Sequence, residues 1–127
     1  MNTDLYHRQN ILQHYKNPHN YGVLDDSSVS ATATNSSCGD EVTVSLQIKD
    51  NIVREAKFQG AGCVISTATT SILTDYLKGK TIAEIQKIDR NKLMELLGIE
   101  VSPSRLKCLL IGLEATHKAI LAVKSQS

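Results

Sequence analysis

Residues 42–58 read VTVSLQIKDNIVREAKF, and this stretch decides the fold. Its first half alternates apolar and polar residues, which is typical of a β-strand that buries one face. Asp50 and Asn51 favour a tight hairpin turn, so we expect the chain to reverse there and to form a second strand over residues 52–58. A similar alternation at residues 29–33 predicts another strand. Together these segments indicate a small three-stranded antiparallel sheet.

Helical patterns flank the predicted sheet. Apolar residues recur at helical spacing in five segments, at residues 4–16, 63–78, 82–88, 90–97 and 103–124. Capping residues mark several of the boundaries, with starts expected at Thr81, Asp89 and Ser102-Pro103 and ends at Gly79 and Gly98. The order helix, sheet, helices predicts one α+β domain over residues 1–127, with the helices packed on one face of the sheet.

The composition narrows the class of protein. The chain has 127 residues, of which 41% are hydrophobic and 4% aromatic, and a formal net charge of +1. These proportions predict one packed core and exclude general disorder, and the balanced charge argues against binding to nucleic acid. No apolar run approaches the ~20 residues that span a bilayer, and the polar N-terminus lacks the apolar segment of a secretory signal. We therefore expect a cytoplasmic protein that binds neither nucleic acid nor membranes.

Three cysteines, Cys38, Cys63 and Cys108, are the main chemical candidates. A cytoplasmic protein keeps its thiols reduced, so a disulfide framework is the least favoured use of them. Cys38 stands two residues before Asp40, and Gly39 between them permits the bend that lets both side chains reach one ion. Cys63 opens a predicted helix, where the helix dipole favours the thiolate, and Cys108 lies in the first turns of the last helix.

Cys38, Asp40, Cys63 and Cys108 together supply three thiolates and one carboxylate. Four such ligands are enough for tetrahedral zinc or for the four protein positions of a two-iron cluster. The alternative is inert packing, because free cysteine is often a buried apolar side chain and the spacings contain no C-x-x-C pair. Glycines beside two of the cysteines, the nearby aspartate and the helix starts favour the metal site.

The other polar residues are interpreted as structural. His7, His14 and His19 lack metal-like spacing and are expected at the surface, whereas His117 is expected in the core or at its rim. His117 belongs to an apolar stripe that we expect to form the core face of the last helix, with Leu106, Leu109, Leu110, Leu113, Ile120 and Leu121. The hydroxyl residues within 66–74 are interpreted as solvated or helix-packing positions.

Five motifs, spread over nearly the whole chain, carry a family resemblance. They are Asn17-Pro18-x-Asn20-x-Gly22, Cys38-Gly39-Asp40, Gly60-x-Gly62-Cys63-x-Ile65-Ser66, Lys78-Gly79-Lys80 and Arg105-Leu106-Lys107-Cys108. In combination they resemble the U-type iron–sulfur cluster assembly proteins, which comprise IscU, SufU and the N-terminal domain of NifU. The resemblance implies a SufE/NifU-like α+β fold and a site made of Cys38, Asp40, Cys63 and Cys108. It also implies a partner, a cysteine desulfurase of the IscS or SufS type that delivers sulfur as a persulfide.

Two functions fit this resemblance. The first is a scaffold that assembles a labile [2Fe–2S] cluster and transfers it to recipient apoproteins or carriers, in which case similarity to IscU indicates Cys108 as the persulfide acceptor. The second is a zinc-bound sulfurtransferase of the SufU type, in which Cys38 leaves Zn²⁺ to accept the sulfur. Lys107 before the third cysteine resembles SufU, whereas the short spacing between the second and third cysteines resembles IscU. We favour the scaffold, and place a purely structural zinc module last because such sites usually avoid aspartate.

Overall fold

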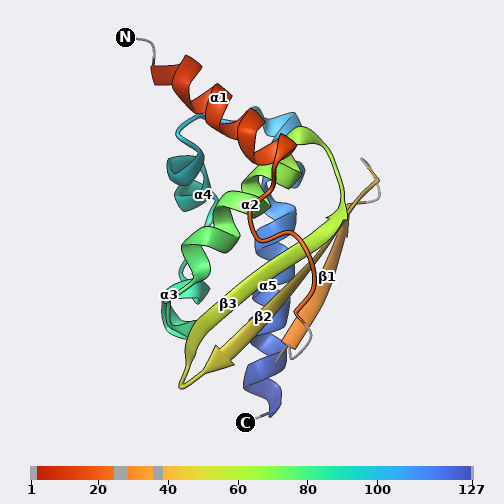
Figure 1. Ribbon diagram of the computed structural model, residues 1–127, viewed down its shortest axis with the longest axis vertical. Coiled ribbons are helices and arrows are strands. Elements are labelled where there is room, and N and C mark those ends of the chain that lie inside the picture. The colour runs from red at the N-terminus through yellow and green to blue at the C-terminus, as the bar shows by residue number, and fades with distance from the viewer. Residues whose placement is uncertain (1–2, 25–28, 36–38, 127) are drawn as a thin grey trace.

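The computed structural model describes residues 3–24, 29–35 and 39–126, and Figure 1 shows their arrangement. The elements are α1 (Thr3–Lys16), β1 (Val29–Asn35), β2 (Asp40–Lys49), β3 (Ile52–Ala61), α2 (Val64–Leu77), α3 (Ile82–Gln86), α4 (Arg90–Leu97), a 3₁₀ turn (Pro103–Arg105) and α5 (Leu106–Gln126). None of the helices in these ranges has both the length and the apolarity that crossing a membrane requires.

The three strands form an antiparallel sheet in the order β1-β2-β3, as the alternation predicts. Asp50 and Asn51 adopt φ angles of 56° and 62°, which is the left-handed backbone of a two-residue hairpin turn. β3 continues past residue 58 to Ala61 and ends within the glycine-rich stretch Gly60-Ala61-Gly62. Gly60 makes this extension possible, since a Cβ atom there would lie 2.0 Å from the carbonyl oxygen of Glu41 on the neighbouring strand.

The helices cover one face of the sheet, as predicted (Figure 1). The last helix, α5, contacts β1 and β2, α2 contacts β3 and α5, and α1 lies against α2. The core between these layers includes Phe58 and Leu46 from the sheet and Leu73 and Leu109 from the helices, each at most 2% exposed. Because α2 and α5 run side by side beneath the sheet, their packing determines where their N-terminal ends meet.

Helix α5 differs from the sequence predictions in the sides that it buries and in how it begins. Leu121 of the predicted stripe is 62% exposed, whereas Ile111, Ala115 and Ala119 on another side of α5 are at most 1% exposed. The reason is that α5 packs against the sheet on one side and against α2 on another, so two of its sides are buried rather than one. The helix is also preceded by a 3₁₀ turn, and Ser102 makes no side-chain capping hydrogen bond there.

Five of the hydroxyl residues of α2 are buried and Thr67 is half-buried, so the helix-packing interpretation holds for these five and the solvated one is wrong for them. Ser66, Thr69, Thr70, Ser71 and Thr74 are each at most 2% exposed. Several hydroxyls bind carbonyls of their own helix, as Thr70 Oγ1 does with Ser66 at 2.7 Å, and so remain satisfied in the core. A Cβ atom on Gly112 of α5 would lie 2.3 Å from Thr70 Oγ1, so a small residue there allows the two helices to approach closely.

The predicted caps of the short helices are confirmed. Thr81 forms a capping box with Glu84 at the start of α3, and the Asp89 side chain accepts a hydrogen bond from the Lys92 N–H at the start of α4. Gly98 ends α4 in the left-handed conformation with φ 79°. These caps fix the connection that returns the chain to the start of α5.

Candidate metal centre

Three of the four predicted ligands come together where β2, α2 and α5 begin. Asp40 is the first residue of β2, Cys63 is the N-cap of α2, and Cys108 lies in the first turn of α5. One ligand atom from each, a carboxylate oxygen and the two Sγ atoms, lies within 4.8 Å of the other two. Cys38 lies outside the described residues. The structure therefore brings together a carboxylate and two thiols from segments far apart in sequence, while their role as ligands stays a prediction.

Asp40 has the geometry of a ligand rather than of a surface acid. Its side chain is only 4% exposed, and Oδ1 accepts a hydrogen bond from the backbone N–H of Cys63 at 3.2 Å. Within the described part of the chain, the buried Oδ2 atom has no hydrogen-bond partner. A buried carboxylate oxygen without a partner is costly in free energy, so a position of this kind is expected to serve a bound group.

Gly62 allows the close packing around this carboxylate. A Cβ atom at Gly62 would lie 2.2 Å from Ser66 Oγ and 3.3 Å from Asp40 Oδ1. Any larger residue would therefore push apart the start of α2 and the carboxylate at the start of β2. The local sequence Gly62-Cys63 thus places a thiol and an aspartate side by side, and the glycine is part of the site.

The environment of Cys63 favours its thiolate. Burial by itself raises the pKa of the thiol, but hydrogen bonds from the Ser66 backbone, Cys108 and the Ser66 hydroxyl outweigh it, so the net pKa lies below the ordinary value. The negative charge of Asp40 works against this lowering. The chemistry expected of this residue from its helix-start position therefore agrees with its surroundings.

Cys108 is buried at 5% exposure and follows the exposed residues Arg105 and Lys107 in sequence. It lies on the side of α5 that also carries Ile111 and Ala115, as the helical spacing predicts. The site offers two soft thiolates from the starts of two helices and one hard carboxylate from the start of a strand. This combination suits zinc or iron. The residues present therefore fit either of the two groups that the sequence suggests.

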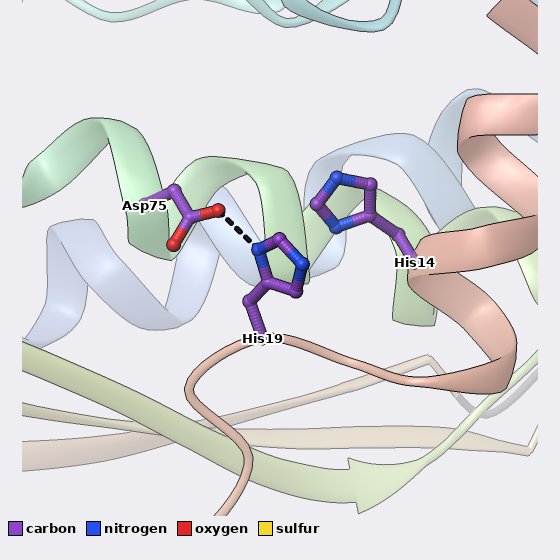
Figure 2. Close-up of side chains that lie close together, drawn as sticks. All are labelled: His14, His19 and Asp75. Atoms are coloured by element: carbon purple, nitrogen blue, oxygen red, sulfur yellow. Dashed lines mark hydrogen bonds and ion pairs between the residues drawn. The ribbon is translucent and has the colours of Figure 1, made fainter.

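A second cluster lies at the other end of α2, and the sequence predictions missed it. His14 was expected at the surface but is only 9% exposed, and its Nδ1 atom lies 2.7 Å from Ser71 Oγ. His19 Nδ1 is 2.6 Å from Asp75 Oδ2, and the two imidazole rings lie 4.3 Å apart between centroids (Figure 2). Asn17-Pro18 ends α1 and turns the chain back toward α2, which is the signal that could have placed these histidines together.

The remaining histidine predictions differ in outcome. His117 is partly exposed, with Nε2 3.2 Å from the carbonyl oxygen of Ile85, and this confirms its predicted position at the rim of the core. The side chain of His7 lies outside the described residues. The pKa of His14 is lowered, first by burial and second by the neighbouring charge of His19, while Asp75 acts in the opposite direction.

Comparison with known proteins identifies the family. The model of the NifU-like N-terminal domain matches residues 6–127, which is nearly the whole chain. The protein belongs to the NifU-like N-terminal domain family. This confirms the resemblance drawn from the five motifs.

Relatives within the NifU-like family bear different functional names. The zinc-dependent sulfurtransferase SufU of Bacillus subtilis is 35% identical, and the alignment covers 94% of this chain and 92% of that protein. The iron–sulfur cluster assembly scaffold protein IscU 1 of Archaeoglobus fulgidus is 36% identical over 87% of this chain and 72% of that protein. In fold, the N-terminal part of a nitrogen-fixing NifU-like protein from Brucella abortus superposes with a TM-score of 0.79 at 20% identity, covering 94% of each chain.

The two alignments differ in how many positions lack a counterpart in this chain. The alignment with SufU runs over 136 positions, more than the 127 residues of this chain, so that relative carries positions without a counterpart here. The alignment with the A. fulgidus IscU runs over 111 positions and 87% of this chain, which is close to one residue for each position. Alignment with the A. fulgidus IscU therefore needs fewer unmatched positions than alignment with the B. subtilis SufU.

Proposed function

We propose that this protein is an iron–sulfur cluster assembly scaffold, which accepts sulfur from a cysteine desulfurase, assembles a labile [2Fe–2S] cluster and transfers it to apoproteins. The observation that carries the proposal is the meeting of Asp40, Cys63 and Cys108 within 4.8 Å, with a buried Asp40 oxygen that has no partner among the described residues. Cys38, two residues before Asp40, is the fourth proposed ligand. The 36% identity to a relative named as an iron–sulfur cluster assembly scaffold supports the same function.

The donor set suits a cargo that must leave again. Thiolates bind iron firmly, whereas a carboxylate is a harder and weaker ligand for a cluster. Asp40 is therefore the ligand that is expected to exchange when the cluster is transferred. A structural site, by contrast, would use four firm ligands.

Sulfur enters this scheme by thiol exchange. An acceptor thiolate of this protein attacks the terminal sulfur of the desulfurase persulfide, the sulfur–sulfur bond of that persulfide breaks, and the desulfurase cysteine leaves as a thiolate. Similarity to IscU favours Cys108 as the acceptor, and its burial at 5% exposure means that the start of α5 must shift to expose Sγ. Reduction of the transferred sulfur to sulfide then needs an electron donor of the cell.

A zinc-dependent sulfurtransferase is the second candidate, favoured by the 35% identity to SufU and by Lys107 before Cys108. In that function Zn²⁺ stays in the site, keeps the thiolates deprotonated, and releases Cys38 to accept sulfur. The same four residues serve both functions. The difference lies in whether the metal is the cargo or a resident ion.

Anaerobic reconstitution distinguishes the two. The metal-free protein is incubated with ferrous iron, cysteine, a desulfurase and a dithiol reductant that reduces the transferred sulfur to sulfide, and visible absorption, iron, sulfide and zinc are then measured. The scaffold predicts iron and sulfide in the ratio of a [2Fe–2S] cluster, visible absorption bands, and transfer to an apo-ferredoxin. Tight stoichiometric zinc that iron cannot displace, without visible absorption, would instead favour the sulfurtransferase. Zinc in the protein as purified does not decide the question, because an empty thiolate site collects zinc.

A further inference from the structure

The cluster at the C-terminal end of α2 contains the donors of a second metal site. His14 comes from the end of α1, His19 from the loop that follows, and Asp75 from the last turn of α2. One ligand atom from each lies within 4.8 Å of the other two, and Figure 2 shows the Asp75 carboxylate beside the His19 ring, with the His14 ring next to His19. Three chain segments therefore direct metal-binding side chains to one point.

Neighbouring groups hold these side chains in place. The Asn20 amide Nδ2 donates to Asp75 Oδ1 at 2.8 Å, which leaves Oδ2 on the side of His19. The Ser71 hydroxyl oxygen accepts from the backbone N–H of His19 at 2.8 Å and lies 2.7 Å from His14 Nδ1. Such outer partners are a regular feature of metal sites, because they orient imidazole and carboxylate ligands.

The charge and access of the cluster also suit a cation. Asp75 supplies one negative charge, and the nearby Lys78 ammonium, which opposes a cation, is paired with Glu55 at 3.2 Å and binds Asn20 Oδ1 at 2.5 Å. The side chains of His19 and Asp75 are 55% and 43% exposed, so an ion can enter from solvent, while the buried His14 is held firmly. A set of two imidazoles and one carboxylate selects against calcium and magnesium, which prefer all-oxygen sites, and suits zinc and similar divalent ions.

We propose that His14, His19 and Asp75 form a second metal site, for Zn²⁺ or a divalent ion of similar softness, in addition to the cysteine site. The ion replaces the proton that His19 and Asp75 share and takes water at the remaining positions. Cys63 and Asp75 lie on the same helix, about 18 Å apart along its axis at 1.5 Å per residue, so one ion cannot serve both sites. A bound ion ties the end of α1 and the following loop to α2.

Zinc binding to the full chain tests this site. Metal-free protein is titrated anaerobically with Zn²⁺ against a chromophoric chelator, and the bound equivalents are counted by native mass spectrometry. The variants are His19→Gln and Asp75→Asn, which change exposed side chains and are not expected to unfold the protein. The matched control is His117→Gln, because His117 lies on α5 against the Ile85 carbonyl and outside both clusters.

The expected result is one more equivalent of zinc in the wild type and in His117→Gln than in His19→Gln or Asp75→Asn. In the variants, affinity for this equivalent falls by at least about 100-fold. NMR resonances of the His14 and His19 rings should shift together as the equivalent binds, while those of His117 stay in place. Equal zinc stoichiometry in all four proteins, or a shift of neither ring, would overturn the proposal. Because the comparison is between variants, it holds whatever the cysteine site binds.

Discussion

The two ends of α2 hold clusters of metal-binding side chains that are built differently. At the N-terminal end, Asp40, Cys63 and Cys108 are partly or fully buried, and Asp40 Oδ2 has no hydrogen-bond partner in the described ranges. At the C-terminal end, His19 and Asp75 are largely exposed and already bound to each other. An ion at the first end relieves an unsatisfied buried oxygen, whereas an ion at the second must replace existing hydrogen bonds.

This difference predicts two kinds of binding. The cysteine end should bind its metal tightly, because the apo site carries the cost of an unpaired buried carboxylate oxygen and offers soft thiolates. The histidine end should bind more weakly and act on local structure, because it joins α1 and the following loop to α2. Variants along α2 separate these roles.

Substitutions at the two ends of α2 should differ in their effect on cluster formation, and this is the largest expected difference. Cys63→Ser keeps the backbone N–H that binds Asp40 but removes the thiolate whose pKa is lowered, so reconstitution should give essentially no stable cluster by visible absorption. His19→Gln should form the cluster at the wild-type level, because it lies at the other end of the helix. A loss of cluster in His19→Gln would show that the two ends are coupled and would contradict the separation.

A substitution on α5 where it packs against α2 should change the free energy of unfolding but not metal binding at either end of α2. Gly112→Ala places a methyl group 2.3 Å from Thr70 Oγ1, and although alanine favours the helix by about 1 kcal/mol, overpacking costs about 1–3 kcal/mol. We expect a net loss of about 1 kcal/mol in the free energy of unfolding, measured by urea denaturation. Thr70→Ala in the same chain should recover part of it, and the exposed Glu114→Ala is the control. A stabilised Gly112→Ala protein would mean that α2 and α5 are free to separate.

A smaller effect on zinc binding than the loss of a ligand is expected from the residue that orients Asp75. Asn20 has φ 60°, and its amide donates to Asp75 and Thr74. Asn20→Gly keeps the left-handed backbone but removes these hydrogen bonds, so zinc binding at the histidine end should weaken about tenfold. Calorimetric titration measures the change, and cluster formation at the cysteine end should stay the same. Unchanged zinc affinity would remove Asn20 from the account of the second site.

Local signals in the sequence were sufficient for most of the fold. The alternation in residues 42–58 predicted the hairpin, and Asp50-Asn51 predicted its turn, because both depend on neighbouring residues. Caps such as Thr81 and Asp89 are equally local and were correctly placed. The three described members of the predicted site also meet in space. They lie at the start of a strand and at the starts of two helices, and glycine and proline positions mark these starts in the sequence.

The features that sequence reasoning missed depend on tertiary contacts. The second buried side of α5 arises because the helix lies between the sheet and α2, and no helical pattern states how many neighbours a helix has. The burial of Thr70 follows from its contact with Gly112, which is far away in sequence. The histidine cluster needs Asp75 to lie opposite a loop that is more than 50 residues earlier in the chain, a contact that spacing rules do not capture.

The lifetime of the cluster in Asp40→Ala is the most direct test of the proposed scaffold. Wild type and variant are reconstituted anaerobically, and the loss of visible absorption is followed after adding an iron chelator, with circular dichroism as a check on folding. If Asp40 is the exchangeable ligand through which the cluster leaves, the variant cluster should persist several-fold longer. A shorter lifetime in correctly folded Asp40→Ala would contradict this role of the carboxylate.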